Sequence, residues 1–313
     1  MTHDSGDTQE NAQETTPPNS SRDELSDFVN RPPYPREHLT WIQRLAIRIG
    51  ARLNRPGLAR KINVWWGKVF TCSVLYRLTG HRWRNHNIEI LELIDDDTPL
   101  LIVSNHRTFF DMYVGITALR YATKYRIGTP AFFPVRAPFF YDRLLGIFMN
   151  VLFSGGSMWP PIFRGEQRGE LNPVSLKIID AQLTLDGVCL GFHPEGRRSK
   201  SDDPYTLEPP KRGVGDLIQR ADDRLVIVPL FISGVSDNIK REIKLRKKKY
   251  GESDPIHFYW GQPKSARDYE GDNMSIARAV HAEIQALGDM ARRAEQGADT
   301  RDHAQEEPAA AQG

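Results

Sequence analysis

The sequence has little of what would place it in several common classes of protein. It contains only two cysteines in 313 residues, Cys72 and Cys189, with no spacing typical of a metal site or a disulfide framework. We therefore expect both to be small buried side chains in a reducing cytoplasm. The sequence also lacks a basic-then-apolar export signal and any apolar run near the roughly 20 residues that a membrane-spanning helix needs. Contact with a membrane is therefore expected only at its surface.

A strong net charge is also missing. The 42 Lys and Arg residues are balanced by 40 Asp and Glu residues, so the overall charge points to no particular partner. The run 240–249 is locally basic, and both a solvated helix face and attraction to an anionic surface explain it. It has no interleaved aromatic residues and matches no recognisable module, so we expect no nucleic-acid partner. The 39% of hydrophobic residues is ordinary for a globular protein with a core.

Composition and hydrophobic pattern divide the chain into five segments. Residues 1–37 and 293–313 have few apolar side chains and are predicted to be disordered tails, the first of them acidic. Residues 38–88 are predicted to form a pair of amphipathic helices. Residues 89–270 carry the main domain, and residues 271–292 a C-terminal helix.

The segment 38–88 combines tryptophans with cations. Apolar residues recur every three or four positions from Trp41 to Leu53, and arginines fill the other face. The next helical run repeats this mixture around Trp65 and Trp66. The pattern is typical of helices bound at a membrane interface, although packing of both helices on the domain also explains it.

The main domain alternates between two kinds of segment. Short apolar, β-branched or aromatic runs predict strands, and longer amphipathic runs between them predict helices. This alternation predicts an α/β fold with a central mixed sheet flanked by helices, preceded by the N-terminal helical pair. Strands are expected at 88–93, 99–104, 131–135, 188–192, 225–233 and 256–260, and helices at 111–121, 171–185 and 274–292.

His106 and Asp111 lie between an expected strand and an expected helix. Five positions along a continuous helix would rotate Asp111 about 140° away from His106, so they can meet only if His106 lies in the turn before the helix. There the carboxylate can fix the tautomer of His106 while the other ring nitrogen takes a proton from a hydroxyl. Alone, this spacing favours a structural histidine.

A second polar segment, 193–199, follows the strand expected at 188–192. Its Pro194-Glu195-Gly196 turn presents a carboxylate, and Arg197 and Arg198 follow at once. Guanidinium forks suit the geometry of phosphate. By itself, the segment favours a charged surface loop.

Taken together, the two segments resemble the glycerophospholipid acyltransferase family, which includes glycerol-3-phosphate and 1-acylglycerol-3-phosphate acyltransferases. The family has four sequence blocks, which are similar in order to residues 105–111, 161–164, 194–199 and 226–230. The resemblance covers about residues 89–265.

Two residues depart from the family pattern. His193 stands where an aromatic residue is usual, and Arg197 stands where threonine is common. These departures concern the identity of the acceptor more than the chemistry.

The resemblance implies a role for each matching residue. His106 would be the general base and Asp111 would orient it. The residues that bind the acceptor would be Arg164 and Arg198, which contact its anionic group, and Glu195 and Gly196, which shape its pocket. The family needs no metal and no cofactor, because acyl-CoA or acyl carrier protein enters as a co-substrate.

The resemblance also implies an activity for residues 89–270, which would be the catalytic domain of an O-acyltransferase. It would move a fatty acyl group to a hydroxyl of a glycerol-phosphate or lysophospholipid acceptor, with 1-acylglycerol-3-phosphate the first choice. Two alternatives stay open: a non-glycerol lipid acceptor such as an aminolipid, and a non-catalytic relative that binds a membrane surface or a carrier protein. The expected partners are the thioester donor, the lipid acceptor and an anionic membrane surface, and the expected location is peripheral to a membrane in the cytoplasm.

Overall fold

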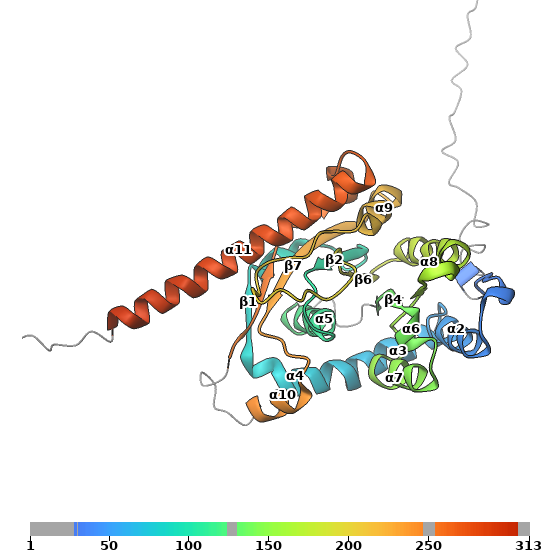
Figure 1. Ribbon diagram of the computed structural model, residues 1–313, viewed down its shortest axis with the longest axis horizontal. Coiled ribbons are helices and arrows are strands. Elements are labelled where there is room, and N and C mark those ends of the chain that lie inside the picture. The colour runs from blue at the N-terminus through green and yellow to red at the C-terminus, as the bar shows by residue number, and fades with distance from the viewer. Residues whose placement is uncertain (1–27, 30, 124–129, 247–253, 306–313) are drawn as a thin grey trace, which may run out of the picture.

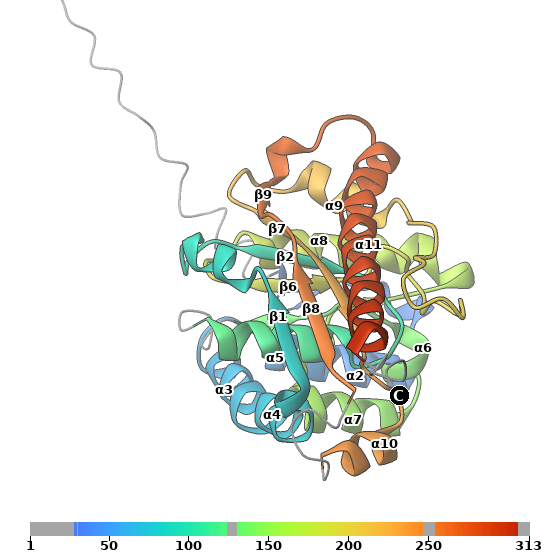
Figure 2. The same ribbon diagram turned by 90° about the vertical axis from the view of Figure 1, so that its left-hand side faces the viewer.

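The computed structural model describes residues 28–29, 31–123, 130–246 and 254–305. A mixed β-sheet lies at the centre of the described chain, and helices cover both of its faces (Figures 1 and 2). The fold class expected from the sequence is therefore confirmed.

The main sheet has the strand order β1-β8-β7-β2-β6-β3, and β9 pairs with β7. Neighbouring strands run parallel, except that β7 is antiparallel to both β8 and β9. The parallel strands β6, β2 and β7 therefore end side by side at one edge. The strands of the main sheet are β1 (Trp83–His86), β2 (Leu100–Ser104), β3 (Ala131–Phe132), β6 (Cys189–Phe192), β7 (Val226–Ser233), β8 (Ile256–Trp260) and β9 (Lys264–Ser265).

Strand β2 lies at the middle of the sheet and is completely buried. Leu101 and Val103 face one hydrophobic core, and Leu100 and Ile102 face the other, as the period of two along a strand requires. Both cores together stabilise the position of β2, because each fully buried aliphatic side chain contributes about 1.5–3 kcal/mol.

Different helices cover the two faces of the sheet (Figures 1 and 2). One face packs against α8, α9 and α11, and the other packs against α5. The bounds of these helices are α5 (Asp111–Ala122), α8 (Arg168–Leu183), α9 (Gly213–Arg220) and α11 (Asn273–Gln305).

The N-terminal helices pack beside the sheet rather than on its centre. Helix α2 (Trp41–Leu53) begins at Thr40, whose side chain forms a capping box with Gln43. Its buried face joins a third hydrophobic core with α6 (Ala137–Phe140), α7 (Leu144–Ser154) and α8. A second helical run consists of α3 (Leu58–Trp66), the π-helical η2 (Gly67–Cys72) and α4 (Ser73–Thr79).

The strand expected at 88–93 is wrong, because this segment is a 3₁₀-helix, η4 (Ile88–Leu93). Asn87 adopts a left-handed conformation with φ 61° and turns the chain out of β1. In a 3₁₀-helix, side chains three residues apart align, and Ile88, Leu91 and Ile94 all pack toward the same core. The apolar, β-branched content of this run favoured a strand, whereas its spacing of three fits the 3₁₀-helix.

The strand expected at 131–135 is divided between two sheets. Its first part is β3, whereas its end pairs as β4 (Val135–Arg136) with β5 (Pro161–Ile162) in a separate parallel pair. The remaining short elements are η1 (Arg36–His38), η3 (Gly80–Arg82), η6 (Gly165–Gln167), α10 (Ile239–Leu245) and η7 (Ala266–Asp268).

Both ends of the chain are ordered over more residues than the sequence suggested. Helix α11 continues to Gln305, past the boundary expected at 292. Near the other end, Val29 and Tyr34 are buried, and the Tyr34 hydroxyl lies 2.9 Å from Ser175 Oγ. Of the expected tails, residues 1–27, 30 and 306–313 lie outside the described residues, as does the end of the basic run beyond residue 246. In the part of the chain that the structure describes, no helix is long and apolar enough to cross a membrane.

Candidate active site

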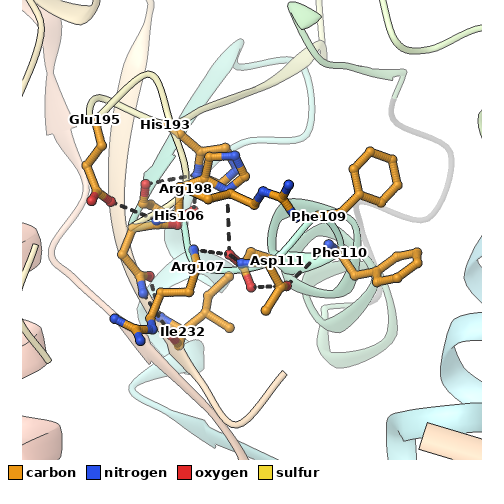
Figure 3. A network of polar contacts seen from close by, with 12 residues as sticks. His106, Arg107, Phe109, Phe110, Asp111, His193, Glu195, Arg198 and Ile232 are labelled. Atoms are coloured by element: carbon orange, nitrogen blue, oxygen red, sulfur yellow. Dashed lines mark hydrogen bonds and ion pairs between the residues drawn. The ribbon is translucent and has the colours of Figure 1, made fainter. Parts of the chain in front are cut away.

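The polar segments singled out in the sequence come together where β2, β6 and β7 end (Figure 3). His106 follows β2 and Glu195 follows β6, while Asp111 is the first residue of α5. The turn between strand and helix that the His106–Asp111 spacing requires is present. It brings His106 Nδ1 to 3.6 Å from Asp111 Oδ2, an ion-pair distance rather than a hydrogen bond.

Asp111 is buried and organises the turn that carries His106. Its Oδ2 accepts hydrogen bonds from the backbone N–H groups of Arg107 at 2.6 Å and Thr108 at 2.7 Å. Its Oδ1 accepts one from the Thr108 hydroxyl at 2.5 Å. The carboxylate therefore holds the backbone of its own loop and lies beside His106 at the same time.

Asn105 fixes the same turn to the neighbouring strand. Its side-chain Nδ2 donates to the carbonyl of Ile232 at 2.8 Å, and its Oδ1 accepts from the N–H of Ile232 at the same distance. This paired contact continues the β2–β7 ladder by one step through a side chain. The sequence showed Asn105 only as a polar residue after a largely apolar strand, and no role was predicted for it.

Glu195 is 1% exposed and both of its carboxylate oxygens are occupied. Oε1 accepts from the N–H of His106 at 2.8 Å, and Oε2 accepts from the N–H of Glu208 at 2.7 Å. Burial raises the pKa of Glu195, and the two N–H donors oppose that shift. In this structure Glu195 thus connects the two loops of the site. It would shape the acceptor pocket, the role expected for it, by holding the backbone of these two loops.

His193, at the end of β6, lies against His106. The two imidazole rings are nearly parallel, with an interplanar angle of 5° and a centroid distance of 3.9 Å (Figure 3). His193 Nδ1 lies 3.0 Å from the backbone carbonyl oxygen of Ser104. Burial first, and then the neighbouring His106, lower the pKa of His193 to about 3. The sequence marked His193 as a departure from the family pattern but did not predict this contact.

The carbonyl oxygen of Gly196 is a meeting point for arginine side chains. Arg136, from β4, donates to it, and Arg164 Nη2 lies 3.5 Å from it. Burial, together with repulsion from Arg164, Arg198 and Arg197, lowers the pKa of Arg136. Arg164 was expected here from the sequence. Arg136 was missed, because only the pairing of β4 with β5 brings it to this place.

Arg197 and Arg198 each have an acidic partner. Arg198 Nη1 lies 2.6 Å from Asp237 Oδ2, and the other oxygen of Asp237 accepts from the N–H of Phe109 at 2.6 Å. Arg197 pairs with Glu208. Arg198, expected to contact the acceptor's anionic group, is thus paired with Asp237 beside the His106 loop in this structure.

The loop between β6 and α9 links the site to the C-terminal helix. Arg107 donates to the backbone carbonyls of Ser201 at 2.8 Å and Asp203 at 3.1 Å. Asp203 in turn pairs with Arg292 of α11 at 2.6 Å. His281 of α11 lies 2.9 Å from the carbonyl of Glu208, whose N–H binds Glu195.

The arrangement brings together all six residues selected from the sequence. His106, Asp111 and Glu195 form one connected group, and Arg164 and Arg198 lie around the Gly196 turn that follows Glu195. Within the described ranges, no group of three or more His, Cys, Asp or Glu side chains is arranged to hold a metal ion. The chemistry that this group offers is a histidine base beside a buried carboxylate, next to a cationic cluster.

Comparisons with known proteins bear on the same region. Residues 85–233 match the model of the Acyltransferase family. No curated protein matches the sequence. Among solved structures, the chain is similar to the crystal structure of the 1-acyl-sn-glycerophosphate (LPA) acyltransferase PlsC from Thermotoga maritima. The TM-score is 0.46 and the identity is 12%, and the match covers 87% of this chain and 95% of that one. The matched segment 85–233 contains every candidate site residue, and over this segment the chain is similar to the Acyltransferase family.

Proposed function

We propose that this acyltransferase moves a fatty acyl group from the thioester of acyl-CoA or acyl carrier protein to a hydroxyl of a glycerol-phosphate or lysophospholipid. The acceptor we favour is 1-acylglycerol-3-phosphate. One observation carries the proposal. Glu195 binds the backbone N–H of His106, and the arginine side chains gather around the next residue, Gly196. A base and a site for an anion are therefore adjacent.

In the proposed reaction, His106 takes the proton of the acceptor hydroxyl as its oxygen attacks the thioester carbonyl carbon. A carbon–oxygen bond forms, the carbon–sulfur bond breaks, and His106 returns the proton to the departing thiolate. The carboxylate of Asp111 at 3.6 Å favours the imidazolium that exists between these two proton transfers.

The proposed site for the acceptor phosphate is formed by Arg164 and Arg136. Both are directed to the Gly196 carbonyl, and their mutual repulsion would be relieved by a bound dianion. A phosphate-bearing acceptor fits this charge better than an aminolipid, whose headgroup carries a cation.

The acceptor specificity is tested by incubating the purified protein with acyl-CoA and a panel of acceptors, with products identified by mass spectrometry. Arg164→Ala is expected to raise the KM for a phosphorylated acceptor about tenfold, because a charge-assisted contact contributes about 1.5–3 kcal/mol. Arg220→Ala is the matched control, since Arg220 pairs with Asp180 away from the site. An unchanged KM in Arg164→Ala would favour the aminolipid alternative. Liposome binding without turnover of any donor would favour the non-catalytic one.

We also propose that the protein binds an anionic membrane surface through the expected segment 38–88, and that α7 contributes to the same surface. Helix α3 exposes Ile62 and Trp65, between the exposed lysines 61 and 68. Helix α7 has no charged residue and exposes Leu145 and Phe148. The Trp66 indole N–H donates to the carbonyl of Leu152 at 2.8 Å, which joins the two helices. A contiguous apolar surface with cationic neighbours is typical of interfacial binding.

Co-sedimentation with vesicles tests this surface. Trp65→Glu and Phe148→Glu are each expected to weaken binding to vesicles containing phosphatidylglycerol about tenfold, through lost apolar burial and added negative charge. Met290→Glu, at an exposed site on α11, is the control. Equal binding of all variants would contradict the proposal.

A further inference from the structure

The orientation of the His106 ring is not fixed by Asp111 alone. All the hydrogen bonds that Asp111 accepts come from Arg107 and Thr108, and His106 Nδ1 lies beyond hydrogen-bond distance at 3.6 Å. Among the described residues, no other group makes a hydrogen bond to His106 Nδ1. An ion-pair contact constrains direction weakly, so something else must hold the plane of the ring.

His193 provides that constraint. Its ring lies face to face with His106 at 3.9 Å and 5°, so a rotation of the His106 ring out of its plane would bring the two rings into collision. His193 is itself held at two points. It directly follows β6, and its Nδ1 contacts the backbone carbonyl of Ser104 at the end of the adjacent β2. Two neighbouring strands therefore fix His193 before it contacts the base.

The contact with Ser104 also defines the chemical form of His193. His193 Nδ1 lies 3.0 Å from the Ser104 carbonyl oxygen, which can only accept a hydrogen bond, and 3.2 Å from the Ser104 hydroxyl, which can donate or accept. From the shorter contact we infer that Nδ1 carries the proton and donates to the carbonyl. The titratable groups that act on the ring are His106, which lowers its pKa, and Asp111, which raises it, and burial outweighs both. The result is a neutral ring stacked on the catalytic base, rather than two histidines that compete for one proton.

We propose that His193 is a positioning residue for the catalytic base: its neutral ring holds His106 by stacking and stabilises the imidazolium that His106 becomes during acyl transfer. A cation over the face of a neutral aromatic ring is attracted to it, whereas a second cation there would repel it. In the proposed reaction His106 becomes an imidazolium by taking the hydroxyl proton, so the stabilisation acts on turnover and not on acceptor binding. The inference rests on the proposed role of His106.

The test compares His193→Phe with His193→Ala. Phenylalanine keeps a neutral ring face but loses the bond to Ser104, whereas alanine loses both. We expect His193→Ala to lower kcat roughly 3- to 30-fold at an unchanged acceptor KM, and His193→Phe to restore most of that loss. His193→Arg is expected to fall below His193→Ala, because a permanent cation would face the imidazolium.

The control is His257→Ala, which removes a stacked histidine from the distant β1–β8 edge and is expected to leave kcat unchanged. Circular dichroism and melting temperature establish that each variant is folded. A kcat for His193→Ala equal to wild type, or a kcat for His193→Phe as low as that of His193→Ala, would overturn the proposal.

A measurement that does not require acyl transfer tests this inference separately from the proposed function. Nuclear magnetic resonance of wild-type protein with ¹⁵N-labelled histidine is expected to show His193 as the neutral Nδ1–H tautomer at pH 6. A shift of the His106 ring signals in His193→Ala would report the loss of the stack. A charged or Nε2–H form of His193 would overturn the inference even if acyl transfer is found. If His106→Ala retains full activity, the proposed base is wrong and so is the effect of His193 on turnover, whatever the tautomer.

Discussion

The sheet carries two pairs of stacked histidine rings, one at its lateral β1–β8 edge and one at the ends of β2 and β6. The two pairs differ in the groups that their ring nitrogens contact. At the β1–β8 edge, His86 Nε2 and His257 Nδ1 are 3.0 Å apart and bind each other, and the His86 ring also stacks on Tyr259. At the ends of β2 and β6, His193 Nδ1 binds a backbone carbonyl instead, and the neighbouring His106 faces a carboxylate.

This difference separates a structural histidine pair from one suited to catalysis. When two imidazoles bind each other, one must donate and the other accept, so each fixes the protonation of its partner. In the His106–His193 stack, His193 Nδ1 contacts Ser104 and not the other ring, so His193 does not set the protonation of His106 through a hydrogen bond. Stacking alone therefore does not indicate function. The group that each ring nitrogen contacts is the feature that distinguishes the two pairs.

The largest expected effect tests the comparison directly. His106→Gln is expected to lower kcat about 10²- to 10⁴-fold, the usual contribution of a general base, while the protein stays folded. His257→Gln, the same change in the other stack, is expected to leave kcat within about twofold of wild type. Steady-state acyl transfer and circular dichroism of both variants check this, and similar losses in the two variants would remove the distinction between the stacks.

An intermediate effect concerns the support that Glu195 gives to the backbone of His106. Glu195→Ala leaves the partly buried N–H groups of His106 and Glu208 without an acceptor, and a fully buried group of this kind costs about 1–3 kcal/mol. We expect the free energy of unfolding in urea to fall by about 2–4 kcal/mol, with kcat reduced as well. Glu208→Ala, which removes the side-chain pair with Arg197 but leaves the Glu195 contacts in place, serves as the control and is expected to lower the free energy of unfolding by less. Equal stability of both variants would show that Glu195 does not connect the loops.

The smallest effect distinguishes the stacks by their pH dependence. The folded-state pKa of His193 is about 3, below the usual 6.5, so the unfolded chain binds more protons as the pH falls below about 6.5. The resulting stability is present above that pH and is lost on acidification toward the folded-state pKa. Replacing His193 by Phe should therefore reduce the loss of unfolding free energy between pH 7 and 5 by about 1–2 kcal/mol.

His257→Phe is the comparison for that experiment. Burial, and then His86, also lower the pKa of His257, so its effect has the same sign, but this histidine is more solvated and we expect a smaller change. Urea unfolding curves at the two pH values measure both variants. A larger pH effect for His257→Phe than for His193→Phe would contradict the assignment.

Much of the fold could be predicted from the sequence, because β2, β6, β7 and β8 are apolar runs with clear ends. Strand β1 could not, since its residues Trp83–His86 are mostly polar and half-buried at the edge of the sheet. The pair His106 and Asp111 could be placed because local geometry fixes it. The contacts of Glu195, Arg136 and His193 could not, since each depends on neighbours 60 to 89 positions away along the chain.

The contacts of helix α11 determine when, during synthesis of the chain, the site becomes fully supported. Its residues Arg292 and His281 hold the loop that supports Arg107 and Glu195, and these in turn hold the His106 turn. A chain still growing on the ribosome lacks this last support until residue 292 has emerged, even though residues 85–233 are already complete. The acyltransferase is therefore expected to become fully active only after residue 292 has emerged, when the helices proposed to contact a membrane are already available.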